Sequence, residues 1–229
     1  MQIPVYFVYL IPILAVWAGF LFVWLAKPKN KNHVRLLLAF SGAFLLALTF
    51  FELLPEVYEH HDSRTIAVFI LAGILLQIFL EFFSKGAEHG HLHLDLADRK
   101  FPILLFLSLS IHALIEGTPI HGNEPILYGI VIHKLPVAIV LGIFVLNSNM
   151  VYGLKLFFMI AFSLMTPLGS LLANNSQWLS EHGQYLTALA IGVFLHISTI
   201  ILFESSQGHS FNLRKLIVII LGVGLAYFL

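Results

Sequence analysis

Two histidines and a glutamate lie inside long apolar runs, where ionisable side chains are costly. His112 and Glu116 are four residues apart in one run, and His133 lies in the next. Residues four apart on a helix are neighbours on one face. Ionisable groups within a membrane span are rare and usually functional, and imidazole with carboxylate suits a divalent transition metal such as zinc. The first hypothesis is therefore a metal site inside a bilayer.

The composition is typical of a membrane protein. The chain is 59% hydrophobic and 10% charged, with a mean hydropathy of +0.93, whereas soluble domains carry roughly 25% charged residues. The net charge is zero, so nothing indicates a nucleic-acid partner. The lack of cysteine excludes disulfides and thiolate metal ligands. The first apolar run has no basic leader and no small-residue cleavage site, so we expect it to be retained as a span.

Eight apolar stretches are long enough to cross a bilayer, which takes about 20 residues. They predict an all-α, polytopic membrane protein that forms a single domain over residues 1–229 in the lipid bilayer. The stretches lie near 5–26, 34–54, 65–84, 102–120, 126–147, 152–173, 184–204 and 212–229.

Lysine and arginine are distributed unevenly between the connections. Ten of the twelve basic residues fall in the odd-numbered connections. Because cytoplasmic loops carry the excess of lysine and arginine, both termini are predicted to lie outside. The segment 85–101 is then a cytoplasmic loop, and its His89, His91 and His93 could hold a metal ion transiently.

A weak internal repeat accompanies this topology. Residues 42–46 read Gly-Ala-Phe-Leu-Leu in the second stretch, and residues 192–196 read Gly-Val-Phe-Leu-His in the seventh. These are the middle members of spans 1–3 and 6–8, which would cross the membrane in opposite directions. Such inverted repeats are typical of transporters, whose substrate site lies near the midplane.

The fourth and fifth stretches would place the three ionisable residues together. The short connection between them predicts antiparallel packing, so that His112, Glu116 and His133 meet at one depth. Pro136 leaves the carbonyl of the residue four positions earlier without its helical partner, and Pro167 does the same in the sixth stretch. Each proline indicates either a cavity with a free carbonyl or a simple packing kink.

These motifs resemble those of the ZIP family of divalent-metal transporters. The family's fourth-span pattern is His-Asn-x-x-Asp/Glu-Gly, matched in part by residues 112–117, and its fifth-span pattern by residues 133–137. The Leu-Leu-Pro-Glu sequence at 53–56, the Pro-Leu-Gly at 167–169 and the histidine-containing loop also look like family features. The resemblance implies eight spans, a metal site between the fourth and fifth spans, alternating access between two helix bundles and a homodimer.

The chain departs from the family pattern at several positions. Ala113 replaces the usual asparagine, Lys134 an acidic or amide residue, and Val137 a ligand, while Thr166 lies where some relatives place a glutamate. By analogy, one metal position keeps His112, Glu116 and His133 but loses its fourth ligand. A second, adjacent position is lost.

Lys134 changes the charge balance of the predicted site. With a charged lysine, two neutral imidazoles and one carboxylate, the net charge is zero, and a divalent ion would be uncompensated in a low dielectric. Four explanations stay open. The lysine is neutral, it pairs with Glu116 until metal arrives, the site binds weakly and briefly, or transport has been lost.

Two further residues are accessory candidates. Glu52, at the end of its span, is either a ligand on the ion pathway or a helix-end carboxylate reaching for water. His196 lies mid-span in the seventh stretch and either gates the pathway or packs with a hydrogen-bond partner.

Together these observations predict import of Zn²⁺, or of Fe²⁺ or Mn²⁺, into the cytoplasm across a plasma or inner membrane. The metal ion is the substrate, no cofactor is expected, and the protein is not expected to be an enzyme. Two alternatives remain. One is an intramembrane zinc-dependent hydrolase, which would need a general base besides Glu116, and the other is a metal sensor that does not transport.

Overall fold

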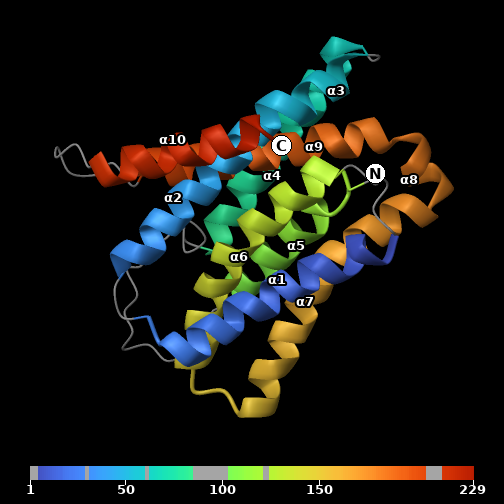
Figure 1. Ribbon diagram of the computed structural model, residues 1–229. Helices are drawn as coiled ribbons and strands as arrows, with labels where there is room; N and C mark the ends of the chain where they lie inside the picture. The colour runs from blue at the N-terminus through green and yellow to red at the C-terminus, as the bar shows by residue number, and fades with distance from the viewer. Residues whose placement is uncertain (1–4, 29–30, 60–61, 85–102, 121–123, 205–212) are drawn as a thin grey trace.

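The computed structural model describes residues 5–28, 31–59, 62–84, 103–120, 124–204 and 213–229, and all the regular elements in these ranges are helices (Figure 1). The long helices are α1 (Val5–Ala26), α2 (Lys31–Leu48), α4 (Ser63–Ser84), α5 (Ile103–Glu116), α6 (Glu124–Asn147), α7 (Tyr152–Asn175), α9 (Gly183–Glu204) and α10 (Leu213–Tyr227). The short ones are the π-helical η1 (Thr49–Leu53), α3 (Leu54–Glu59) and α8 (Gln177–Glu181).

The chain is a multi-pass membrane protein. Six helices of the described part are long and apolar enough to cross a bilayer: α1, α4, α6, α7, α9 and the continuous helix from α2 to α3. α5 has 14 residues and α10 has 15, and each follows a segment outside the described residues. The prediction of eight spans, like that of the inverted repeat, therefore stays a prediction.

The second predicted span ends later than the sequence suggested. We expected it to stop near residue 54, but the helix continues through η1 and α3 to Glu59. Within η1 the backbone widens, and the N–H of Leu54 bonds to the carbonyl of Thr49, five residues back. Pro55 has no N–H to give to the preceding turn, and its ring would clash there. The π-helical turn accommodates the proline without ending the helix.

The fourth predicted span ends earlier than expected. Helix α5 stops at Glu116 rather than near residue 120. The next residue is Gly117, and the residue before Pro119 is disfavoured in the helical conformation. Thr118 closes the helix, since both its backbone N–H and its hydroxyl donate to the carbonyl of Ile115. The turn that follows is largely buried, as backbone without helical bonds must be at membrane depth.

The helices pack into two groups of four. The first contains α1, α5, α6 and α7, and the second contains α2, α4, α9 and α10 (Figure 1). The groups meet where α2 packs against α6 and where α5 lies against α4 and α9. The predicted metal-site residues therefore lie in the first group, at its boundary with the second.

Glycines allow two pairs of helices to approach backbone to backbone. A Cβ at Gly117 or Gly169 would lie 2.1 Å or 1.9 Å from a carbonyl oxygen of the facing helix, where α5 crosses α7. The same holds where α4 crosses α9, since a Cβ at Gly73 or Gly192 would lie 2.0 Å from a facing carbonyl oxygen. Small residues at such crossings permit close packing of helices in a bilayer.

Asp62 starts α4 at the surface of the protein. Its carboxylate accepts hydrogen bonds from the backbone N–H of Thr65 at 2.8 Å and from the Thr65 hydroxyl at 2.6 Å. These bonds stabilise the charged form and hold the pKa of Asp62 below its ordinary value. Asp62 thus acts as a helix cap.

Candidate metal centre

His112, Glu116 and His133 come together in the structure. One ligand atom from each lies within 4.8 Å of the others. The three residues are only 2%, 1% and 1% exposed, and the two imidazole rings are 5.7 Å apart between centroids. The structure thus assembles, between α5 and α6, the three side chains that the sequence singled out.

The end of α5 favours a cation at this place. Glu116 is the last residue of the helix and His112 lies one turn before it. The C-terminal end of a helix carries a partial negative charge from carbonyls that lack helical partners. Helix α7 supplies donors to this region, because the Thr166 hydroxyl lies 3.0 Å from the Ala113 carbonyl and the Ser170 hydroxyl 3.2 Å from that of Ile120.

The two carboxylate oxygens of Glu116 have different neighbours. Oε1 accepts hydrogen bonds from the Lys134 ammonium and from the Thr166 hydroxyl. Oε2 lies 3.2 Å from Nε2 of His112. The Lys134 Nζ also lies 5.2 Å from the ring centroid of Phe162, within the range of a cation–π contact. One oxygen is thus bound to a fixed cation while the other faces the imidazoles.

His133 is held from the second helix group. Its Nδ1 lies 3.0 Å from the hydroxyl oxygen of Ser41 on α2, and Ser41 is fully buried. Among the described residues, Nε2 of His133 and Nδ1 of His112 have no hydrogen-bond partner, and Nε2 of His112 has only Oε2 of Glu116 beside it, at 3.2 Å. Buried polar atoms are rarely left without partners. Nitrogens that face one another beside a carboxylate are placed as metal ligands are.

Sequence reasoning missed the roles of Ser41 and Thr166. Thr166 stood out as a departure from a family pattern, but not as a hydrogen-bond donor to Glu116. Ser41 gave no signal, because single serines are common in apolar helices and its partner is 92 positions away.

Of the accessory candidates, Lys134 contacts Glu116, whereas Glu52 and His196 lie apart from the cluster. Glu52 is half-buried within η1 and is not one of the clustered ligands. Nε2 of His196 lies 2.7 Å from Oε2 of Glu81, so this histidine pairs across the α4–α9 contact. We had not singled out Glu81, although a carboxylate inside a span is a signal. His89, His91 and His93 fall outside the described residues.

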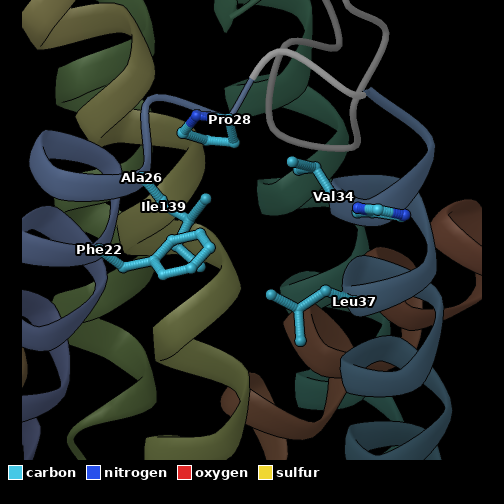
Figure 2. A pocket seen from close by; sticks show the side chains of 7 residues that line it. Phe22, Ala26, Pro28, Val34, Leu37 and Ile139 are labelled. Carbon is cyan, nitrogen blue, oxygen red and sulfur yellow. The ribbon is translucent and has the colours of Figure 1, made fainter.

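A separate cavity of about 470 Å³ lies between α1 and α2, and Figure 2 shows its lining. Phe22 and Ala26 of α1 face Val34 and Leu37 of α2, with Ile139 of α6 between them. The lining is mostly apolar and includes none of the three clustered ligands.

The fold and the site together define a multi-pass helical membrane protein with a buried imidazole–carboxylate cluster. No family model matches the chain. The chain is 31% identical over 162 residues to the protein zntD of Dictyostelium discoideum. That match covers 60% of this chain and 24% of zntD, so the chain spans about a quarter of that protein's length.

Proposed function

We propose that this protein transports a divalent transition-metal ion through a single intramembrane site formed by His112, Glu116 and His133. The cargo is Zn²⁺ or an ion of similar ligand preference, Fe²⁺ or Mn²⁺, carried into the cytoplasm across a plasma or inner membrane. The observation that carries the proposal is the buried cluster of three ligands at the end of α5. The match to zntD supports divalent-metal transport as the general class.

The ligand set fits this cargo. Two imidazoles and a carboxylate leave a tetrahedral zinc ion one further position, which a water molecule can fill. Discontinuous helices whose ends face a cation are a recurring feature of transporter sites, and α5 ends at the cluster. Protonation of the imidazoles and the carboxylate competes with metal, so acidification should weaken binding.

Lys134 favours weak, exchangeable binding over tight capture. Its ammonium lies against Glu116 and cancels the one negative charge of the cluster. An arriving ion must compete with the lysine for the carboxylate. A transport site has to release its ion, so moderate affinity is compatible with conduction. Of the explanations that the sequence left open, the ion pair favours a lysine that holds Glu116 until the metal arrives.

The geometry supports a transporter better than a hydrolase. A zinc hydrolase needs an ionisable group free to move protons beside the bound water. Here Glu116 is itself one of the three proposed ligands, and its Oε1 accepts hydrogen bonds from Lys134 and Thr166, so it is not free for that role.

The test is Zn²⁺ flux into proteoliposomes that contain the wild-type protein or the His112→Ala/His133→Ala variant. We expect saturable flux for the wild type and loss of nearly all of it in the double variant. His182→Ala is the matched control, since it removes a surface histidine outside the cluster and should leave the flux unchanged. Competition by Fe²⁺ and Mn²⁺ would then rank the cargo.

Other outcomes would redirect the interpretation. Metal binding without flux above empty liposomes would reject transport and leave a sensor. Chelator-sensitive hydrolysis in detergent would support the hydrolase.

The proposal also includes the mechanism and the assembly that the resemblance implies. The two helix groups would move relative to each other during alternating access, and two copies would form a homodimer. A mass measurement on the purified protein, corrected for bound detergent, tests the dimer.

A further inference from the structure

Ser41 makes a polar contact from the second helix group to the cluster of candidate metal ligands. It lies on α2, whereas His112, Glu116 and His133 lie on α5 and α6 of the first group. Its hydroxyl oxygen is 3.0 Å from Nδ1 of His133, and both residues are at most 1% exposed. Their burial shields this hydrogen bond from bulk water.

The direction of this hydrogen bond decides which ring nitrogen of His133 can bind a metal. A neutral imidazole carries its proton on one nitrogen and a free lone pair on the other. If Nδ1 carries the proton and donates it to Ser41, the lone pair lies on Nε2. Nε2 is also the nitrogen that has no partner among the described residues. With the opposite tautomer, Nε2 would present a hydrogen and could not bind an ion.

We propose that Ser41 is a positioning residue of the metal centre: it accepts the Nδ1–H of His133 and thereby fixes the tautomer that turns the Nε2 lone pair toward the ion. This inference rests on the proposed metal site and assigns a role to a residue of the other helix group. Metal-binding histidines generally donate their second N–H to such a partner.

The packing around Ser41 holds the bond in place. Helix α2 runs antiparallel to α6 and also contacts it at Gly129, where a Cβ would lie 2.1 Å from a methyl carbon of Leu48. The bond therefore forms only while α2 and α6 stay in register. The affinity of the site for metal is then linked to the contact between the two helix groups.

The test compares Ser41→Ala with Ser198→Ala, using purified protein in detergent. Ser198 is also a fully buried serine, but it lies on α9 and its hydroxyl has no hydrogen-bond partner among the described residues. We expect Ser41→Ala to weaken binding of Zn²⁺ and Co²⁺ about 10- to 100-fold, as removal of such partners does elsewhere. Ser198→Ala should bind as the wild type does.

The second readout is the tautomer itself, followed by the ¹⁵N chemical shifts of the His133 ring in metal-free protein. The wild type should show a protonated Nδ1 and an unprotonated Nε2, and Ser41→Ala should show a mixture. Ser41→Thr, which keeps the hydroxyl, should restore the wild-type shifts where it folds. Protonated Nε2 in the wild type, or unchanged metal affinity in a folded Ser41→Ala protein, would overturn the proposal.

These measurements are independent of transport. Wild-type protein that binds metal with the expected tautomer but gives no flux would reject the proposed function and leave the role of Ser41 intact. Normal flux and normal metal affinity in Ser41→Ala would reject the role of Ser41 and leave the proposed transport function intact.

Discussion

At the scale of single residues, Glu116 divides its two oxygens between a fixed cation and the imidazoles. Oε1 is bound by Lys134 and Thr166, while Oε2 faces His112. The lysine offsets the cost of burying a carboxylate in an apolar environment. It also reduces the negative charge that would attract a metal ion. The same side chain thus stabilises the metal-free protein and weakens its affinity for the ion.

Replacing Lys134 by methionine should separate these two effects. Without metal, Lys134→Met leaves Glu116 buried without a counter-charge, so the protein should lose about 3–5 kcal/mol of stability. Zn²⁺ should bind at least about tenfold more tightly, because the ammonium that lies against Glu116 no longer repels the ion. Thermal unfolding with and without Zn²⁺ measures both the stability of the metal-free protein and its response to the ion. The zinc-induced increase in melting temperature should be larger for Lys134→Met than for the wild type.

The control for this prediction is Lys134→Met/Glu116→Gln, which removes both charges. That variant should regain stability without metal and respond little to Zn²⁺. Equal zinc-induced shifts in the wild type and Lys134→Met would show that the ammonium does not act on the ion.

At the scale of the helices, the metal centre depends on how closely α5 approaches α7. The crossing at Gly117 and Gly169 brings Thr166 within hydrogen-bond distance of both Glu116 and the Ala113 carbonyl. Any side chain at the crossing would separate the two helices and withdraw the Thr166 hydroxyl. The glycines are therefore needed for the site as well as for packing.

The variant Gly169→Ala should destabilise the protein and weaken its metal binding. The added Cβ would lie 1.9 Å from the Leu114 carbonyl oxygen, and overpacking of this kind typically costs about 1–3 kcal/mol. Gly153→Ala is the matched control on the same helix, because nothing lies within 4 Å of its Cβ position. Melting temperatures and Zn²⁺ titrations of both variants provide the measurement. Equal behaviour of the two would mean that α5 and α7 can separate without cost.

The sequence predicted correctly the features that depend on residues close together along the chain. Apolar length located α1, α4, α6, α7 and α9 to within two residues. Helical spacing placed His112 beside Glu116, and a short connection brought His133 to them. The errors arose from local backbone effects, where Pro55 widened a helix without ending it and Gly117 with Pro119 ended one early. Partners on distant helices, such as Ser41 for His133 and Glu81 for His196, depend on packing that no local pattern encodes.

At the scale of the whole molecule, two lysines cap helix ends on one predicted side of the membrane. Lys155 donates to the carbonyl of Leu146 near the end of α6, at 2.9 Å, and Lys215 donates to that of Leu202 near the end of α9, at 2.7 Å. Cations stabilise the C-terminal ends of helices. Both lysines belong to connections predicted to be cytoplasmic, so the excess of positive charge there also stabilises the helices.

Single introduced cysteines test the predicted orientation, because the chain has none of its own. Glu181→Cys, at the last residue of α8, should react with an impermeant thiol reagent from outside intact cells. Asn149→Cys, between α6 and α7, should react only after permeabilisation. The cysteine-free wild type reports background labelling. A reversed pattern would invert the topology, and labelling of both from one side would contradict α7 as a span.

The burial of the three ligands affects the rate at which metal binds as well as the affinity. A metal ion in water holds a shell of water molecules, and ligands that are only 1–2% exposed leave no room for an ion that keeps its shell. The helices must separate before the ion can exchange water for imidazole and carboxylate. At high metal concentration the rate of binding should therefore level off at the rate of this opening and become independent of how much ion is present.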